Sequence, residues 1–345
     1  MESVITTGLL AYGMSGKVFH APFIEAHHGF KLRAITERTC KKASQDYPDI
    51  ISYDSVDALL NDPVIDLVII NTPNNTHYEY AIQALRKGKH ILVEKPFSAT
   101  TAEAAAIFEL ARSIDRKVFV YQNRRWDSDF QSVKNIVDLG VLGRLNEVHI
   151  RFDRYRTTIS PKTFKEIPIP ASGIQYDLGP HLLDQVISLF GKPISFYKVL
   201  GKNRAETQVD DYFSIHLAYP NSLNVFVHGN MLVTDVQPAY VLHGDKGSFV
   251  KKRADVQEDQ LVTEIKPTQD LYGKEVAGME GQLTLMSDQG LKQYSQITSE
   301  RGSYPLLFDA IFQCLTKGVP YPVKEEEIMT QIHILETPAL QVTFL

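Results

Sequence analysis

Short apolar runs separated by amphipathic segments fill the first third of the chain. The runs lie at residues 4–10, 32–35, 65–70, 90–93 and 118–121. Between them apolar residues recur with a helical period, as at Ala81, Ile82 and Leu85. This alternation predicts a parallel, doubly wound sheet. Two of the helices are expected to begin at Thr76-His-Tyr-Glu79 and Thr100-Thr-Ala-Glu103, which have the spacing of a capping box.

Beyond residue 123 the pattern changes to a period of two. Alternating strands are expected at 145–155, 211–217, 223–228 and 240–243, and helices at 131–139, 180–190, 306–315 and 325–335. Such strands, joined by turns such as Gly244-Asp-Lys-Gly247, favour a second α+β domain with a large, mostly antiparallel open sheet. The fold class is therefore α/β, with a dinucleotide-binding domain at 1–123 and a substrate-binding and oligomerisation domain at 124–345. Residues 253–300 carry no clear pattern.

Composition limits the classes of function. The 345 residues exceed the usual size of a single hydrophobic core, and 43% are hydrophobic, which favours two globular domains. The net charge of −5 gives no electrostatic reason to expect nucleic acid or an anionic membrane as a partner. Cys40 and Cys314 are too few for a disulfide scaffold, and no signal peptide or membrane-spanning run is found, so a cytoplasmic location is expected.

The turn Ala11-Tyr-Gly13-Met-Ser-Gly16 follows the first apolar run. In a dinucleotide fold the second glycine lets the backbone approach the pyrophosphate and the third lets helix and strand pack closely. Gly13 and Gly16 fill those places, whereas Ala11 replaces the first glycine. As an isolated motif, it could equally be a glycine-containing turn that binds no ligand. Its position between a strand and a helix favours the dinucleotide-binding interpretation.

Two residues after the second strand bear on the choice of nucleotide. Glu37 follows Gly16 by 21 residues, close to the spacing of about 20 for the acid that accepts hydrogen bonds from the ribose of NAD. Arg38 opposes this, because a guanidinium there could pair with the 2′-phosphate of NADP or stack on adenine. A surface ion pair of the two side chains remains an alternative. NAD is slightly favoured and NADP stays open.

Several motifs together resemble a known family. They are Ala-x-Gly-x-x-Gly, Asn71-Thr-Pro ahead of His77, Glu94-Lys95-Pro96, Asn123-Arg-Arg, Asp177-x-x-x-His181 and His243-Gly-Asp-Lys-Gly-Ser248. The chain resembles the glucose-fructose oxidoreductase, inositol dehydrogenase and MocA (Gfo/Idh/MocA) family over its whole length. Gly13 to Pro22 and Phe152-Asp-Arg-Tyr-Arg156 are most similar to the scyllo-inositol dehydrogenases of this family.

The resemblance implies an NAD(P)-dependent dehydrogenase that transfers hydride to or from a hydroxyl-bearing carbon of a polyol, inositol or sugar, as a homodimer or homotetramer. The implied catalytic residues are Lys95, Asp177 and His181. The implied cofactor-binding residues are Ala11, Gly13, Met14, Ser15, Gly16, Glu37, Arg38, Asn71, Thr72, Pro73, Asn75, His77, Glu94, Lys95 and Asn123. The implied substrate-binding residues are Lys95, Tyr155, Gln175, Asp177 and His181. No metal site is expected.

Local chemistry supports these roles. Lys95 follows a run of residues that reads as a buried strand. The positive charge of a nearby nicotinamide and the loss of water in the cleft would both lower the pKa of its amine. A cis Lys95–Pro96 peptide bond would aim the side chain inward. Pro180 would place His181 in the first turn of a helix, which favours the neutral imidazole that a general base needs. Asp177 would bind substrate or tune His181, and Asp184 could orient the imidazole. In the competing interpretation, Asp177 caps the helix and His181 is a packed core residue.

Two other functions remain open at this point. Some proteins that resemble this family are nucleotide-sensing regulators, which commonly lack the catalytic lysine or histidine. Others are glycosidases that use tightly held NAD for transient oxidation. Retention of Lys95, Asp177 and His181 favours the dehydrogenase.

Overall fold

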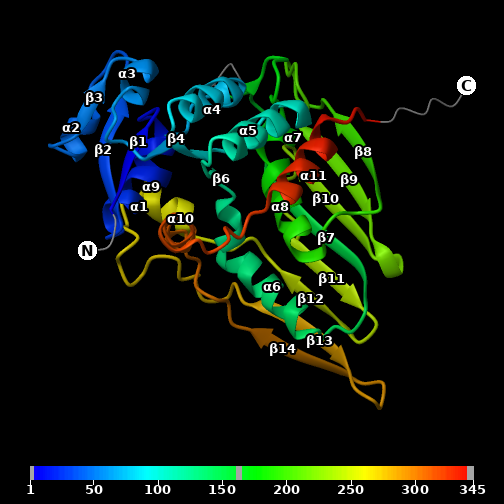
Figure 1. Cartoon of the computed structure of the whole chain (residues 1–345). Helices are drawn as coiled ribbons and strands as arrows, with labels where there is room; N and C mark the ends of the chain where they lie inside the picture. Colours follow the sequence, from blue (N-terminus) through cyan, green and yellow to red (C-terminus); the bar gives the residue numbers. More distant parts are fainter. Residues whose placement is uncertain (1–3, 161–164, 340–345) are drawn as a thin grey trace, which may run out of the picture. The chain divides into compact units, whose positions relative to one another are not determined.

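The computed structural model describes residues 4–160 and 165–339, and the chain forms two compact units (Figure 1). The first unit takes in the chain up to Asn123 together with Gln257–Gly273 and Ser303–Glu325. The second takes in Arg124–Val256, Lys274–Gly302 and the chain from Glu326 onward. The expected second domain was one continuous stretch from 124 to 345, whereas two segments of that stretch belong to the first unit.

The first unit is built on a six-stranded sheet in the order β3-β2-β1-β4-β5-β6. Its strands are β1 (Ile5–Leu9), β2 (Phe30–Thr36), β3 (Ile51–Tyr53), β4 (Leu67–Ile70), β5 (His90–Val93) and β6 (Val118–Val120). All neighbouring strands are parallel. This confirms the predicted doubly wound parallel sheet. The strand order reverses between β1 and β4, and the carboxyl ends at such a reversal are where ligands bind in this architecture.

Helices connect the strands of this sheet. They are η1 (Ser15–His20, a turn of π type), α1 (Ala21–Ala26), α2 (Ala43–Asp46), α3 (Val56–Leu60), η2 (Asn74–Thr76), α4 (His77–Arg86) and α5 (Thr101–Ser113). Thr100 caps α5 as expected, since its side chain accepts a hydrogen bond from the amide of Glu103 at 3.2 Å. The expected capping box of α4 is wrong, because the hydroxyl of Thr76 donates to the carbonyl of Pro73 at 2.7 Å instead.

Aromatic packing explains why a late segment joins the first unit. The helix α10 (Pro305–Lys317), predicted at 306–315, buries Leu307, Phe308, Ile311 and Phe312. Phe308 stacks on Phe23 of α1 with 5.2 Å between ring centroids, and Phe312 packs edge-on against Phe30 of β2. The helix α9 (Gln257–Val262) also belongs to this unit and contacts η1. Contacts between residues so far apart in sequence leave no local pattern.

The second unit is built on an eight-stranded sheet in the order β14-β13-β12-β11-β7-β10-β9-β8. Its strands are β7 (Leu145–Asp153), β8 (Ser195–Gly201), β9 (Tyr212–Ala218), β10 (Asn224–Asn230), β11 (Tyr240–Gly244), β12 (Gly247–Lys251), β13 (Gly281–Met286) and β14 (Lys292–Ile297). All pairs are antiparallel except β7 with β10. The predicted period of two is visible on β7, where Val148, Ile150 and Phe152 are buried.

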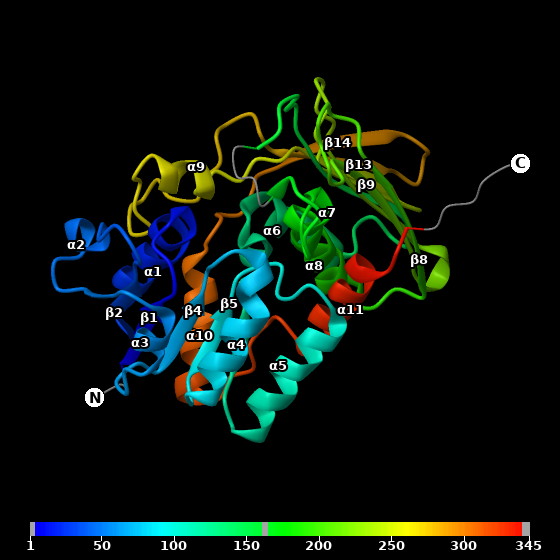
Figure 2. The ribbon, with the colours of Figure 1, turned by 90° about the horizontal axis from the view of Figure 1, so that it is seen from above.

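One face of this sheet is covered by helices (Figure 2). The helices are α6 (Ser128–Leu139), α7 (Ile174–Asp177), α8 (Gly179–Phe190) and α11 (Glu325–Glu336). Two short turns complete the elements: η3 (Asn123–Trp126) precedes α6, and η5 (Pro220–Ser222) joins β9 to β10. Contacts of α8 with β7 and β10, and of α7 with β9, place the core of the unit between this layer and the sheet. The open sheet predicted for the second domain is therefore covered by helices on one side.

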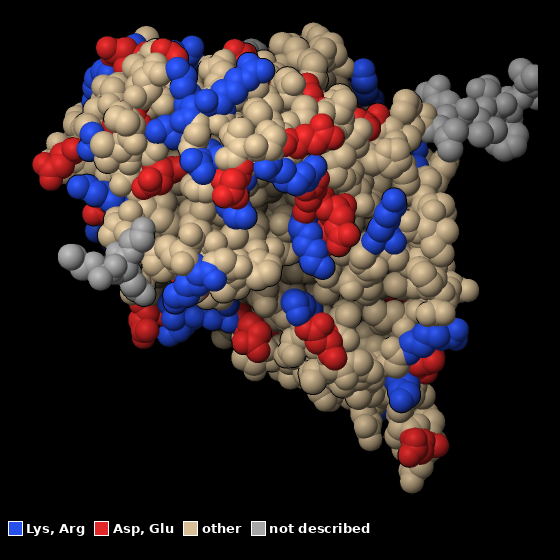
Figure 3. Space-filling model, in the orientation of Figure 1, with Lys and Arg blue, Asp and Glu red and all other residues tan. Residues whose placement is uncertain are grey.

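Surface charge is mixed. On the face drawn in Figure 3, basic and acidic side chains are interspersed, as the small net charge leads one to expect. No helix among the described residues is long and apolar enough to cross a membrane.

Candidate active site

The glycine turn lies at the carboxyl end of β1 and is held by Asn71, which follows β4. The amide of Ala11 donates to Asn71 Oδ1 at 3.0 Å, and Asn71 Nδ2 donates to the carbonyl of Ala11 at 2.8 Å. A Cβ atom on Gly16 would lie 2.2 Å from that same carbonyl oxygen. Gly16 therefore allows the close packing of helix and strand expected of the third glycine. Asn71 holds the backbone of the turn through its two hydrogen bonds with Ala11.

Gly13 lies on the open side of the turn. Apart from its neighbours in the chain, no heavy atom of the described residues lies within 4 Å of a Cβ built on Gly13. The neighbouring Met14 is also half exposed, at 49%. This open backbone is the feature that a pyrophosphate needs in order to approach the chain closely, so the turn fits a dinucleotide.

Glu94 connects the turn to the residues after β5. Its Oε1 accepts from the hydroxyl of Ser15 at 2.7 Å and lies 2.9 Å from His20 Nε2. Its Oε2 accepts from the amide of Lys95 at 3.2 Å. Burial raises the pKa of Glu94, but the hydrogen bonds from His20 and Ser15 outweigh this and hold it below its usual range. Ser15 and Glu94, both expected at the cofactor, thus bind one another.

Lys95 occupies the same edge of the sheet as the glycine turn. It follows β5, which pairs with β4, and its side chain is half-buried. The Lys95–Pro96 peptide bond is cis, as predicted. The amine of Lys95 is thus carried by a loop whose backbone is fixed through Glu94 and, on its other side, through His77.

His77 differs from expectation. It is fully buried at the start of α4, with Nδ1 2.7 Å from the carbonyl oxygen of Pro96 and Nε2 2.9 Å from that of Thr72. Burial lowers the pKa of His77 below its usual value. Both ring nitrogens therefore face backbone, and His77 joins the loops after β4 and β5 instead of offering a nitrogen to a nucleotide.

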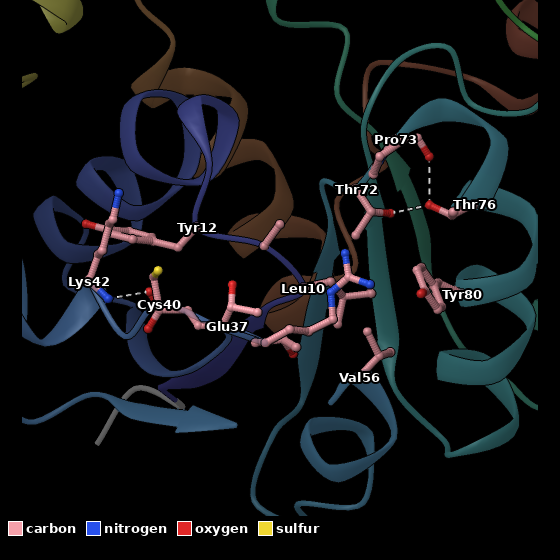
Figure 4. Close-up of a pocket in the computed structure, with 14 residues that line it drawn as sticks. Leu10, Tyr12, Glu37, Cys40, Lys42, Val56, Thr72, Pro73, Thr76 and Tyr80 are labelled. Carbon is pink, nitrogen blue, oxygen red and sulfur yellow. Dashed lines mark hydrogen bonds between the residues drawn. The ribbon is translucent and has the colours of Figure 1, made fainter. Parts of the chain in front are cut away.

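A cavity of about 400 Å³ opens beside the glycine turn, at the reversal of the strand order. Figure 4 shows Tyr12, Glu37, Cys40 and Lys42 on one side, with Thr72, Pro73, Thr76 and Tyr80 across from them. Leu10, Ala11, Thr36, Arg38, Thr39 and Val56 complete the lining. Its size and its apolar walls with a few polar groups are typical of a site for a small ligand.

The second unit carries the other predicted catalytic residues. Pro180 and His181 lie in the first turn of α8, as predicted, and His181 is 5% exposed. Asp177 ends α7 and accepts from Lys165 Nζ at 2.8 Å. Both members of that ion pair are about one-third exposed, at 37% and 31%. Asp177 therefore remains open to solvent.

The carboxylate of Asp184 is bound by an arginine. Its two carboxylate oxygens accept from Nε and Nη2 of Arg125 at 2.7 and 2.8 Å, a bidentate pair that is almost fully buried. Arg125 Nη2 also donates to Glu327 at 2.7 Å. Asp184 thus balances a buried guanidinium, and Arg125 joins η3 to α8 through Asp184 and to α11 through Glu327.

The remaining predicted residues are dispersed. Gln175 on α7 is 9% exposed, and its Oε1 accepts from Lys198 Nζ at 3.1 Å. Tyr155 is 58% exposed. In the first unit, Asn75 is exposed and Asn123 is 5% exposed. Among the described residues no group of three or more His, Cys, Asp or Glu side chains is arranged to hold a metal ion.

Family models match both units. Residues 5–122 match the model described as "Oxidoreductase family, NAD-binding Rossmann fold", and residues 134–340 match the "C-terminal alpha/beta domain" of the same family. The chain belongs to the Gfo/Idh/MocA family of oxidoreductases. The resemblance inferred from the sequence motifs is thereby confirmed, and the first unit is an NAD(P)-binding domain.

Relatives of this oxidoreductase cover nearly its whole length. The oxidoreductase YdgJ of Escherichia coli is 37% identical over 97% of this chain and 96% of its own. The Bacillus subtilis protein IolW, named scyllo-inositol 2-dehydrogenase (NADP(+)), is 34% identical over 96% of this chain and 92% of its own. The crystal structure of the oxidoreductase yvaA from Bacillus subtilis is 33% identical and superimposes with a TM-score of 0.93, covering 97% of this chain and 95% of that one.

Several residues at the site of this oxidoreductase escaped the sequence analysis. Tyr12, Lys42 and Tyr80 line the cavity. For Tyr80 the sequence offered a signal, because a residue four positions after Thr76, which precedes α4, lies on the same side of the helix as Thr76. Lys42 has no comparable signal, because its place depends on the fold of the loop after β2.

Proposed function

We propose that this oxidoreductase is an NAD(P)-dependent dehydrogenase acting on a secondary hydroxyl of a polyol, inositol or sugar. The single observation that carries the proposal is the arrangement at the carboxyl edge of the six-stranded sheet. There the open backbone of Gly13, the turn held by Asn71 and the Lys95 loop share one edge, beside a cavity of about 400 Å³. The name of the relative IolW supports an inositol-like substrate.

Each proposed catalytic residue has a distinct task. When bound, a nicotinamide nucleotide supplies the acceptor for the hydride. Lys95 donates a hydrogen bond to the reacting hydroxyl oxygen and fixes its position. His181 accepts the hydroxyl proton as the carbon–hydrogen bond breaks, so that the two electrons leave as hydride and the oxygen becomes a carbonyl. Asp177 hydrogen-bonds a substrate hydroxyl and keeps Lys165 close.

The test is turnover on a panel of inositols and aldoses, followed by the fluorescence of the reduced nicotinamide. Lys95→Ala and His181→Asn are each expected to lower turnover by about 100-fold or more, the usual size of a proton-handling contribution. Lys87→Ala, at an exposed lysine of the same unit, and His333→Asn, at a histidine 62% exposed, are the matched controls and should leave turnover unchanged.

Nucleotide binding is measured alongside turnover, by calorimetry. Retained binding with lost turnover is the expected result for both catalytic variants. Tight binding by the native protein with no turnover on any polyol would contradict the proposal and favour a regulator. Cleavage of a glycosidic bond without accumulation of reduced nicotinamide would favour an NAD-assisted glycosidase.

The proposal includes a homodimer or homotetramer in the cytoplasm. The sheet face opposite the helices of the second unit supports self-association, because Tyr197 and Tyr294 are 44% and 64% exposed on their strands. Light scattering at several protein concentrations tests this part, and a monomer at all of them would contradict it. The two cysteines, Cys40 and Cys314, are both unpaired thiols, which supports a reducing compartment.

A further inference from the structure

A buried lysine joins two helices of the second unit. Lys198, on β8, is 2% exposed, and its amine donates to the carbonyls of Ile334 and Leu335 at 3.0 and 2.7 Å. These carbonyls lie in the last turn of α11, where they have no partner within the helix and where the helix dipole favours a cation. The amine also donates to Gln175 Oε1 on α7 at 3.1 Å. Lys198 therefore ties α7 to the end of α11.

The helix α7 depends on such contacts for its position. It is a single turn of four residues, and a helix so short is not stable without contacts from elsewhere. Besides Lys198, it is held by Asp210, whose carboxylate accepts from the amide of Gln175 at 2.7 Å and whose carbonyl accepts from the amide of Ile174 at 2.9 Å. Asp177 ends the same turn, so the position of its backbone follows from the contacts of Gln175.

The amine of Lys198 keeps its charge in this buried place. Burial lowers its pKa to about 8, and the nearby carboxylate of Asp210 opposes this change. At neutral pH the amine is therefore protonated, and its three hydrogens match its three acceptors. An apolar side chain of the same length would leave all three acceptors without this donor.

The helix α11 also holds the start of α8. Gln331, which is 1% exposed, donates through Nε2 to the carbonyl of Pro180 at 2.9 Å, directly before His181. Glu327, one turn before Gln331, binds the guanidinium that also pairs with α8. The carbonyls that Lys198 binds lie one turn after Gln331. One face of α11 thus carries the contacts to both α7 and α8.

We propose that Lys198 is a positioning residue of the active site, which holds Asp177 in place for the reaction by tying Gln175 to the end of α11. The side chain of Gln175 serves this link and does not contact substrate. Gln331 has the corresponding task at the start of the helix that carries His181. The inference rests on the proposed function, because it concerns how two of the proposed catalytic residues are held.

The test is a double-mutant cycle on kcat with Lys198→Met and Gln175→Met, measured with the full chain on the polyol that the native protein turns over. Methionine is unbranched, so it fills most of the space of either side chain and removes its polar end. Each single variant is expected to lower kcat by about 10- to 100-fold, the cost of a misplaced catalytic group, with unchanged nucleotide affinity. The double variant should be no slower than the slower single variant, because both substitutions break the same link.

Lys202→Met is the matched control. This exposed lysine follows the same strand and donates to the carbonyl of Gln208 at 2.7 Å, so its loss should leave kcat unchanged. Hydrogen exchange at the amides of α7, measured well below the melting temperature, should be faster by about 10-fold in Lys198→Met and native in Lys202→Met. A lower melting temperature of Lys198→Met with native kcat and native exchange would show a purely structural role and overturn the inference.

Additive losses of kcat in the cycle would also overturn it, because Gln175 would then act independently of Lys198. If Lys198→Met does not fold, Gln175→Met carries the test, since it leaves the bonds of Lys198 to α11 in place. It should lower kcat with KM unchanged. A raised KM with native kcat would show that Gln175 binds substrate and would refute the inference.

Failure of this inference differs from failure of the proposed function. Turnover by the native protein together with native kcat in Lys198→Met and Gln175→Met would refute the positioning role and leave the dehydrogenase intact. A native protein that binds nucleotide and turns over no polyol would refute the proposed function, and the positioning role with it.

Discussion

Replacement of the two glycines of the turn by alanine should separate folding from nucleotide binding. At position 16 the new Cβ would lie 2.2 Å from the carbonyl oxygen of Ala11 and 2.9 Å from Asn71 Nδ2. Neither group can rotate away, because each is bonded to the other through two hydrogen bonds. Gly16→Ala must therefore open the turn, at a cost of about 3 kcal/mol, the upper part of the usual range for overpacking.

Gly13→Ala should behave in the opposite way. Beyond its neighbours in the chain, the added Cβ meets no described heavy atom within 4 Å, and the φ of Gly13 is not in the left-handed region. The free energy of unfolding should stay within about 0.5 kcal/mol of the native value. The methyl group would nevertheless occupy the surface that a pyrophosphate approaches, so dinucleotide affinity should fall by about 10-fold or more.

Thermal unfolding and calorimetric titration with NAD and NADP test the two variants. For a unit of this size, a cost of about 3 kcal/mol lowers the melting temperature by roughly 6–12 °C. The expected pattern is an unstable Gly16→Ala and a stable Gly13→Ala that binds poorly. The reasoning would be refuted by a Gly16→Ala variant as stable as the native protein, or by a Gly13→Ala variant with native affinity.

Two further predictions concern the second unit. Asp184→Asn leaves the buried Arg125 with a single carboxylate partner and should cost about 3–5 kcal/mol in chemical denaturation. Glu325→Gln, at an exposed ion pair, is its control and should cost less than about 1 kcal/mol. Burial raises the pKa of Asp210 to about 6 from an unfolded value near 3.8. Its contribution to stability is therefore full below pH 3.8 and is lost as the pH rises through 6, by about 3 kcal/mol. Asp210→Asn should flatten the stability of the protein between pH 4 and 7, and an unchanged pH profile would contradict this.

The fold was largely predictable where a pattern is local. The strands β1, β2, β4, β5 and β6 each follow from an apolar run, and the first turn of α8 follows from Pro180. The strands β3, β8, β13 and β14 were not predicted. β3 has three half-buried residues, and β14 is exposed along nearly all its length, so neither carries a clear alternation. The hairpin of β13 and β14 lies in the stretch 253–300, which had no clear pattern.

The site was predictable as a set of positions but not as a set of contacts. Spacing along the chain correctly placed Gly16 and Lys95 at the edge of the sheet, because that follows from strand order. It could not show that Glu37 turns toward Ser52 or that Asp184 turns toward Arg125. The direction of each carboxylate depends on hydrogen-bond donors that lie far away in sequence. A buried carboxylate turns toward such donors because leaving it without hydrogen bonds costs free energy.

The contacts of Glu94 would link nucleotide binding to the proposed catalysis in the first unit. Glu94 is bonded to Ser15 of the glycine turn and to the amide of Lys95, and Asn71 pairs with Ala11 of that turn. The turn and the lysine loop therefore belong to one hydrogen-bonded group. In the proposed mechanism, a nucleotide that orders the turn would also fix the backbone that carries Lys95, and so the position of its amine relative to the substrate hydroxyl. A substitution that removes the hydrogen bonds of Glu94 should thus lower turnover more than nucleotide affinity. The glycine turn is also held by Asn71, whereas the Lys95 loop is joined to the turn through Glu94.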